Sequence, residues 1–304
     1  MRFSVNMIVI ILIMSSVSVS LAQESENERI ILENYASTPS EILDELEDLG
    51  IVPSGAEEAL AQTGLRFSGA EAQFSNFPNE AEASNIVMGA TLDFSPQADD
   101  LEFCAITTRT QRVESNRLDN GSNIVTIRLD SYVAMGVDSD GSIFAFEISE
   151  DAEIDLHEQA LDLSEPVNLL AVVIEDTLTL FVNGEAIITD YELTLPSGSF
   201  AFLYSGMAEE SACVAETFFA YTIADELVGV CRVSTDSPVN RRDGAGTDFA
   251  RVAQLLAGES LEAVGQIIGT DGFTWWLLED DTWVRDDVVT TTGFCRRLPE
   301  VEGA

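Results

Sequence analysis

Three carboxylates fall within six residues, because residues 153–158 read EIDLHE and include Glu153, Asp155 and Glu158. Two carboxylates that flank a glycosidic bond can cleave it with retention when they lie about 5 Å apart, one as the nucleophile and the other as the acid/base. A regular strand places Glu153 and Asp155 on one face and Glu158 on the other, so this chemistry requires a β-bulge in the strand. The alternative is three acids on the wet face of a strand, and in so acidic a chain we favour it.

A second group of residues suited to binding lies near the C-terminus. Trp275 and Trp276 are adjacent, so a regular strand points them to opposite faces and leaves one of them exposed. The exposed ring can form a binding platform with Phe249 and Phe273 as neighbours. Arg242, or the arginine before it, can receive a carboxylate. The alternative is that both tryptophans pack the core of a small domain, which needs every large side chain.

The segment VDSDGS contains Asp138 and Asp140, whose carboxylates can contact calcium. It lacks the full spacing of a calcium-binding loop, and a hairpin turn explains the same residues. We therefore predict a turn and no cofactor, with calcium as the alternative. His157 is the only histidine in the chain, and without a nearby serine or cysteine pattern it indicates no catalytic triad.

The chain has four cysteines, Cys104, Cys213, Cys231 and Cys295, which allow three pairings. The positions of the cysteines favour Cys104–Cys213 and Cys231–Cys295, because each pair then falls inside one predicted domain, 65–224 or 228–300. Neither pair has the C-x-x-C spacing of a zinc or redox site. Each disulfide would close a long loop and stabilise the fold by roughly 4 kcal/mol.

Composition and the first residues indicate export. Residues 1–22 have a short positive region, an apolar run and small residues before Gln23, as a cleaved export signal does. This run is short for a membrane span, so we predict a secreted protein that is not an integral membrane protein. The formal charge of the 304 residues is −40, and all 14 basic residues are arginines. Such a surface repels nucleic acid, which we exclude as a partner.

The elements that must position these residues are mostly strands. The segment TPSEILDELEDLG predicts a helix, with Thr38 as its cap and Glu41 completing a capping box. From residue 65 to residue 224 the apolar residues recur with period two, and Asn183-Gly184 is a strong hairpin signal. Many short strands with few helices predict an antiparallel sandwich.

The run LLAVVIEDTLTLFVNGEAIITDYELTLPSGSFAFLYSG resembles the closing hairpins of concanavalin-like and laminin-G-like jelly rolls. The resemblance covers about residues 66–223 and implies a sandwich, in a family that includes lectins, adhesion modules and glycosidases. EIDLHE likewise resembles the E-x-D-x-x-E signature of jelly-roll glycosidases. Those enzymes build their sugar clefts on tryptophans, whereas all three tryptophans of this chain lie beyond the predicted sandwich.

Residues 228–300 resemble the bacterial Src-homology-3-like (SH3-like) domain. The segments VNRRDGAGTDFARVAQLLAGESLEAVGQ and DGFTWWLLEDDTWVRDDVV carry the family pattern at Val239, Asn240, Arg242, Gly244, Gly246, Thr247, Gly258, Trp275, Trp276, Trp283 and Val284. Arg241 replaces the usual aliphatic residue, and Thr282 replaces the usual glycine. The resemblance implies a small barrel that recognises cell-wall peptides or other extracellular partners without chemistry of its own.

These observations predict an all-β protein with four parts. They are a signal peptide (1–22), a polar helical segment (23–64), a concanavalin-like jelly-roll sandwich (65–224) and an SH3-like barrel (228–300). The predicted function is non-enzymatic recognition of an extracellular polysaccharide, cell-wall peptide or protein. The alternatives are a polysaccharide hydrolase that uses Glu153 and Glu158, and a structural envelope protein. Because one fold serves many functions, the site must decide among them.

Overall fold

The computed structural model of the chain describes residues 30–69, 73–74, 83–94, 101–119, 122–138, 141–149, 153–160, 165–206, 209, 212–269 and 271–301. Within its strands, the side chains of residues 73–74, 101–102, 112–119, 122–130 and 153–159 are not described. The expected signal peptide lies outside the described residues.

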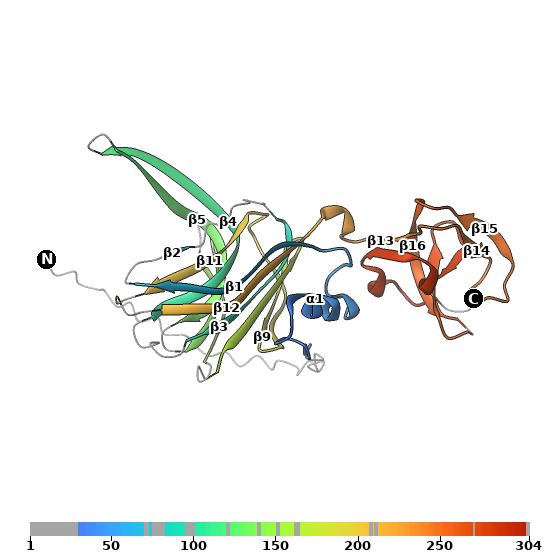
Figure 1. Ribbon diagram of the computed structural model, residues 1–304, viewed down its shortest axis with the longest axis horizontal. Coiled ribbons are helices and arrows are strands. Elements are labelled where there is room, and N and C mark those ends of the chain that lie inside the picture. Colours follow the sequence, from blue (N-terminus) through green and yellow to red (C-terminus); the bar gives the residue numbers. More distant parts are fainter. Residues whose placement is uncertain are drawn as a thin grey trace, which may run out of the picture.

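Twelve strands form two antiparallel sheets, drawn in Figure 1. The first sheet has the order β1-β12-β3-β8-β9-β10. Its strands are β1 (Glu57–Ser68), β3 (Asn85–Asp93), β8 (Val167–Ile174), β9 (Thr177–Val182), β10 (Glu185–Glu192) and β12 (Ala212–Ile223). The second sheet has the order β2-β11-β4-β5-β6-β7. Its strands are β2 (Gln73–Phe74), β4 (Leu101–Asp119), β5 (Ser122–Asp138), β6 (Ser142–Ile148), β7 (Glu153–Ala160) and β11 (Ser199–Gly206).

The main core lies between these two sheets. Alternate residues of both sheets are buried there, among them Ile86 and Met88 of β3, Ile106 of β4 and Phe218 of β12. The prediction of an all-β jelly-roll sandwich is confirmed by this arrangement. The predicted hairpin is also present, because Asn183 and Gly184 both have positive φ angles, 50° and 83°, between β9 and β10. β1 begins at Glu57, ahead of the expected boundary at residue 65.

Helix α1 (Pro39–Asp48) covers the outer face of the first sheet. Its capping box forms as predicted, since the Thr38 side chain accepts a hydrogen bond from the Glu41 N–H and the Glu41 carboxylate accepts one from the Thr38 N–H. Leu46 is fully buried against a cluster that includes Val172 and Phe219. The helix therefore occupies the outer face of the first sheet, and in the described residues no helix lies on the second sheet.

Residues after the short helix η2 (Asp225–Leu227) form a separate seven-stranded antiparallel sheet, which we call the C-terminal sheet. Its order is β15-β14-β18-β17-β16-β13-β19. The strands are β13 (Cys231–Ser234), β14 (Val239–Arg242), β15 (Arg251–Leu255), β16 (Ser260–Ile268), β17 (Thr274–Leu278), β18 (Trp283–Arg285) and β19 (Thr290–Gly293). Two short 3-10 helices, η3 (Asp286–Val288) and η4 (Cys295–Arg297), flank β19.

Both favoured disulfides are present. Cys104 of β4 bonds to Cys213 of β12 and so joins the two sheets of the sandwich, with Cα atoms 6.4 Å apart. Cys231 of β13 bonds to Cys295 of η4 in the C-terminal part, with Cα atoms 4.6 Å apart. Disulfides of this kind form and persist in oxidising compartments.

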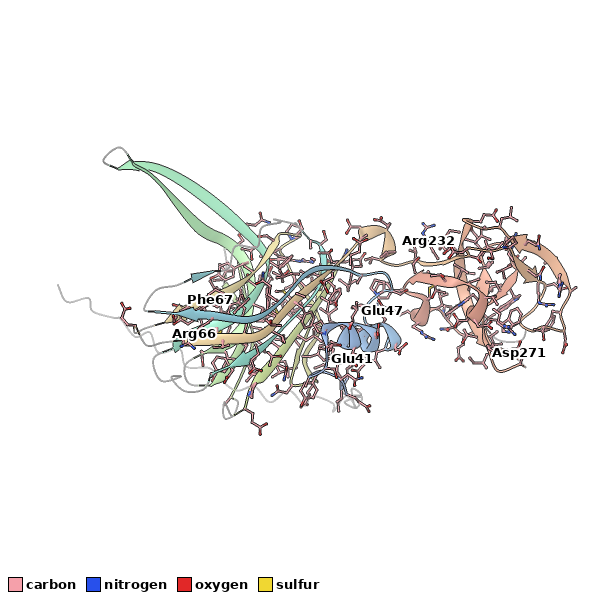
Figure 2. The ribbon with its side chains drawn as sticks, viewed as in Figure 1. Glu41, Glu47, Arg66, Phe67, Arg232 and Asp271 are labelled. Carbon is pink, nitrogen blue, oxygen red and sulfur yellow. A yellow bond between two sulfur atoms is a disulfide. The ribbon has the colours of Figure 1, made fainter. Side chains whose placement is uncertain are left out.

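The segment between α1 and β1 contacts the C-terminal sheet. Ser54 and Gly293 form a two-way backbone pair, with N–H to carbonyl distances of 3.1 and 2.9 Å. Arg297 donates hydrogen bonds to the carbonyl oxygens of Gly50 and Ile51. Glu47 lies at the end of α1 beside this contact (Figure 2) and lines a cavity of about 110 Å³ with Trp276 and Arg296. The N-terminal segment thus joins the sandwich to the C-terminal sheet.

The described residues contain no helix that is both long enough and apolar enough to cross a membrane.

Candidate functional site

The outer face of the second sheet carries a row of half-buried aromatic rings. Along β4, β5 and β6, the residues of the core face alternate with Phe103, Tyr132, Phe144 and Phe146. The rings contact one another: Phe103 meets Phe144 edge-on at 6.0 Å between centroids, and Tyr132 meets Phe146 edge-on at 6.1 Å. We call this surface the aromatic face. We did not predict this face from the sequence, although the alternation of Phe144 and Phe146 in SIFAFEIS indicates an aromatic face.

Strand β7 borders this face and contains a β-bulge within EIDLHE. Phe146 pairs with Asp155, but Ala145 pairs with His157, so Leu156 is an extra residue in the strand. The sequence left open whether this strand has a bulge after Asp155, and the strand pairing shows that it does. An extra residue reverses the alternation of faces beyond it.

The bulge changes which positions of β7 share a face. Glu153 pairs with Ile148, and Glu158 pairs with Phe144. Directly paired residues of antiparallel strands share a face of the sheet. The register positions of all three acids, Glu153, Asp155 and Glu158, consequently fall on the aromatic face, beside Phe144 and Phe146.

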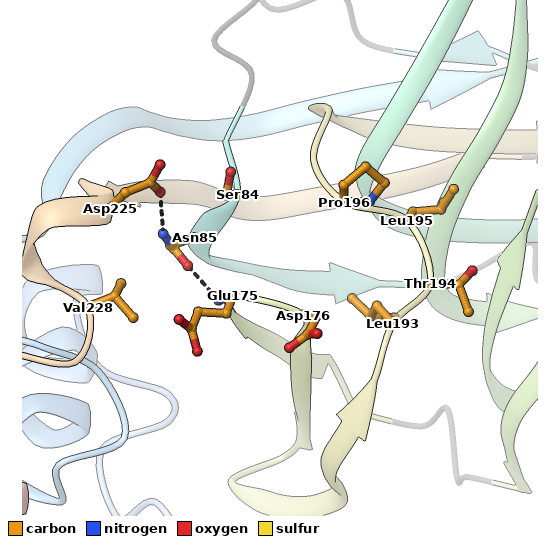
Figure 3. Close-up of a pocket in the computed structure, with 10 residues that line it drawn as sticks. All are labelled: Ser84, Asn85, Glu175, Asp176, Leu193, Thr194, Leu195, Pro196, Asp225 and Val228. Atoms are coloured by element: carbon orange, nitrogen blue, oxygen red, sulfur yellow. Dashed lines mark hydrogen bonds between the residues drawn. The ribbon is translucent and has the colours of Figure 1, made fainter.

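A cavity of about 410 Å³ opens at one end of the sandwich, where several loops converge (Figure 3). Asn85, which is buried, links two of its walls, since its Nδ2 donates to Asp225 Oδ1 at 2.8 Å and its Oδ1 accepts from the Glu175 N–H at 2.5 Å. Asp176 also lines the cavity. Its acidic lining resembles the rest of this surface and indicates no particular chemistry.

Two buried charged residues, Arg109 and Glu147, lie at the same end of the sandwich. Arg109, which is fully buried, donates hydrogen bonds to the carbonyl oxygens of Leu195 and Ser84. Burial lowers the pKa of Arg109, while the charges of Asp176 and Glu147 act in the opposite direction. The Glu147 carboxylate accepts hydrogen bonds from the backbone N–H groups of Thr194 and Leu195. These contacts fix the loop between β10 and β11.

Trp275 and Trp276, one of which was predicted to be an exposed binding platform, are both buried. Trp275 is 2% exposed and Trp276 is 1% exposed, so the prediction that one of them is exposed is wrong. Their indole N–H groups are satisfied within the protein, by Asp271 Oδ1 at 3.1 Å and by Asp286 Oδ1 at 2.9 Å. The hydrogen bond from Trp275 is the main reason that the pKa of Asp271 is lowered. The alternative interpretation, two tryptophans that pack a small domain, describes them correctly.

Two of the predicted binding residues nevertheless line one hollow. Arg242 and Trp275 border a cavity of about 260 Å³, together with Arg285. Arg242 donates to the carbonyl oxygen of Phe249 at 2.7 Å, which holds the loop carrying that exposed ring. The hollow is therefore lined by arginines rather than by an exposed aromatic platform, and Arg285 is already paired with the Asp287 carboxylate.

The predicted turn at Asp138 is present, since Asp138 Oδ1 accepts from the Ser142 N–H at 3.0 Å and its carbonyl accepts from the Gly141 N–H. Asp140 lies outside the described residues. Among the residues that are described, no cluster of His, Cys, Asp and Glu could hold a metal ion.

No protein-family model and no curated protein matches the chain. Solved structures with a similar fold include the carbohydrate-binding module CBM66 from Bacillus subtilis, with 12% identity, a TM-score of 0.37 and coverage of 54% of this chain and 91% of that chain. The galectin LEC-6 from Caenorhabditis elegans has 16% identity, a TM-score of 0.34 and coverage of 51% and 94%. A β-fructofuranosidase from Schwanniomyces occidentalis has 12% identity and a TM-score of 0.37, and the match covers 56% of this chain but only 34% of the enzyme.

Proposed function

We propose that this protein is an exported carbohydrate-binding protein that recognises extracellular polysaccharide with its aromatic face. One observation carries the proposal: half-buried aromatic rings and the register positions of three acids share one face of the second sheet. Among the described residues, α1 occupies the outer face of the first sheet and no helix covers the second sheet, so the second sheet is the face that we assign to the ligand.

The chemistry of this face suits a sugar chain. Aromatic rings give large, rigid apolar contact area, against which the C–H face of a pyranose can pack. Carboxylates accept hydrogen bonds from sugar hydroxyls, and such charge-assisted bonds are stronger than neutral ones. An apolar surface with a few polar groups that set orientation is the usual composition of a ligand site.

A second function, hydrolysis of the bound polysaccharide, is favoured by the bulge at Leu156. The bulge brings the register positions of Glu153 and Glu158 to one face, which is one condition for cleavage by two carboxylates. In this mechanism one of the two glutamates attacks the anomeric carbon, and the other protonates the leaving oxygen and later activates water. Asp155 lies between them on the same face.

We also propose that the C-terminal sheet is an SH3-like module that holds the protein on cell-wall peptide or another extracellular partner. Its support is the sequence pattern of residues 228–300 and the hollow lined by Arg242 and Arg285. Arginine side chains at such a hollow suit a peptide carboxylate. Trp275 then forms part of the wall of the hollow rather than an exposed platform.

The test is a binding and turnover assay on the chain without its predicted signal, residues 23–304. The protein is incubated with insoluble cellulose, chitin, xylan, curdlan and peptidoglycan, and both retention and released reducing ends are measured. Retention without release supports recognition alone. Retention with release that Glu158→Gln abolishes, while retention persists, supports hydrolysis. If none of these polymers retains the protein, the proposal is contradicted.

A further inference from the structure

The hairpin of β4 and β5 extends far beyond the sheet to which it belongs (Figure 1). The pairing of β4 with β11 ends at Thr110, and the pairing of β5 with β6 ends at Tyr132. Beyond these points residues 111–119 and 122–131 pair, in the described part of the chain, only with each other. We call these residues the arm. At about 3.3 Å per residue the arm is about 30 Å long.

The base of the arm is firmly held. Two register shifts flank Gln111, where the arm leaves the sheet. Arg109 has a positive φ of 52° and a fully buried side chain bound to two loop carbonyl groups. Gln111 Nε2 donates to the carbonyl oxygen of Ser197 at 2.6 Å. A bulge bends a strand and increases its twist, so these contacts set the direction in which the arm projects.

The arm differs in charge from the rest of the chain. It contains three arginines and three acids, which cancel, in a protein with a formal charge of −40. The arginines are Arg112, Arg117 and Arg128, and the acids are Glu114, Asp119 and Asp130. The arm is thus a part of this molecule that a second copy would not repel.

The register divides the arm into two unlike faces. Val125, Ile127 and Leu129 are two residues apart along β5 and therefore share one face. On β4, Glu114 pairs with Ile127 and Asn116 pairs with Val125, so both lie on this face. Leu118 is the next alternate residue of β4 and therefore lies on it too. The opposite face carries the positions of Arg117 and Arg128, together with Val113 and Ile124. The same face also carries the positions of Arg112, Glu114, Asn116 and Asn123, so its aliphatic positions form a row along β5 beside mostly polar positions of β4.

We propose that two copies of this chain associate arm to arm, with the face of Val125, Ile127 and Leu129 packed against its equivalent. A two-stranded ribbon by itself is at best marginally stable in water, and a second layer supplies the apolar contacts it lacks. Repulsion between the two acidic bodies does not prevent this pairing. At physiological ionic strength charges are screened beyond about 8 Å. Antiparallel packing of the two arms, each about 30 Å long, holds the bodies further apart than that.

The size of the interface sets its strength. Full burial of an aliphatic side chain corresponds to about 60–120 Å² of apolar area. Four such positions from each copy bury about 500–1,000 Å² in total, less than the roughly 1,200 Å² of a typical stable interface. The dimer is therefore weak and forms reversibly as concentration rises.

Sedimentation velocity over a range from low to high micromolar protein, at physiological salt, tests the proposal. The key variant is Ile127→Asp on the aliphatic face, and its matched control is Ile124→Asp on the opposite face of the same strand. We expect the wild-type chain and Ile124→Asp to shift from monomer to dimer with the same dependence on concentration. Ile127→Asp should remain monomeric, with at least a tenfold weaker association.

A third variant separates dimerisation from folding of the arm. Replacing residues 111–131 by Asn-Gly shortens the hairpin to its base, and near-ultraviolet circular dichroism reports whether the sandwich remains folded. A folded, monomeric shortened chain supports the proposal. A wild-type chain that stays monomeric throughout, a dimer that persists in the shortened chain, or equal loss in both aspartate variants would overturn it.

Discussion

The ring of Phe144 stacks on the ring of Phe146, with centroids 5.2 Å apart and planes 17° apart. Both rings lie on β6, and each also contacts an aromatic ring of another strand of the sheet, Phe103 of β4 or Tyr132 of β5. The aromatic surface is therefore continuous across three strands. A sandwich without tryptophan thus has an aromatic surface of the kind that sugar recognition uses, and the absence of tryptophan from the sandwich is not an argument against a sugar site.

Glu47 should make the stability of the protein depend on pH. Burial, reinforced by the charges of Asp44 and Asp48, raises the pKa of Glu47 from 4.5 to about 7, and Asp286 and Arg296 line the same cavity. Because its folded pKa lies above its unfolded pKa, the contribution of Glu47 to stability is full below about pH 4.5 and is lost as pH rises through 7.

We therefore expect Glu47→Gln to raise the free energy of unfolding at pH 8 by about 1–2 kcal/mol, after allowance for solvent screening, and to leave it nearly unchanged at pH 4.5. Urea unfolding at several pH values measures the difference between variant and wild type. Glu57→Gln is the control, because it also removes one negative charge but lies on the exposed start of β1, outside this cavity. A Glu47 effect that is the same at both pH values would refute this assignment.

Glu147 should be essential to the stability of the sandwich. Its buried carboxylate holds two backbone N–H groups and the hydroxyl of Thr194. Glu147→Ala leaves these donors and the nearby Arg109 without their anion, and we expect a loss of about 3 kcal/mol. Thermal and urea unfolding measure it. The exposed Glu192, changed to alanine, should alter stability by less than about 0.5 kcal/mol.

The disulfide between Cys104 and Cys213 closes a loop with a sequence separation of 109 residues and links the two sheets. Replacing both cysteines by alanine should lower the free energy of unfolding by about 4–5 kcal/mol, because the unfolded chain regains the entropy of that loop. Urea unfolding of the double variant, compared with the wild type under oxidising conditions, measures the loss. A loss below 1 kcal/mol would show that the sandwich does not depend on this link.

The sequence predicted those features that local patterns determine. The capping box of α1, the Asn183-Gly184 hairpin and the period-two strands depend on neighbouring residues, and each was predicted correctly. The disulfide pairing followed from a division of the chain into parts. These features need no knowledge of which strands lie side by side.

The site itself could not be predicted, because it depends on register between strands. The bulge at Leu156 is defined only by its partners Ala145 and Phe146, and it reverses the face on which Glu158 lies. The prediction for Trp275 and Trp276 failed for a related reason. Strand β17 lies between β16 and β18, and residues on both of its faces are covered, so alternation did not expose either ring.

The measurement that tests the central claim most directly is the affinity of the aromatic face for the polysaccharide that retains the protein. Isothermal titration with soluble fragments of that polymer would compare the wild type with Phe146→Ala and with Phe249→Ala, which removes an exposed ring of the C-terminal part. Loss of a ring that stacks on a sugar should weaken binding by about 1–2 kcal/mol, roughly five- to thirtyfold. We predict this loss for Phe146→Ala and unchanged affinity for Phe249→Ala. Unchanged affinity in a folded Phe146→Ala variant would contradict the claim that this face binds the sugar.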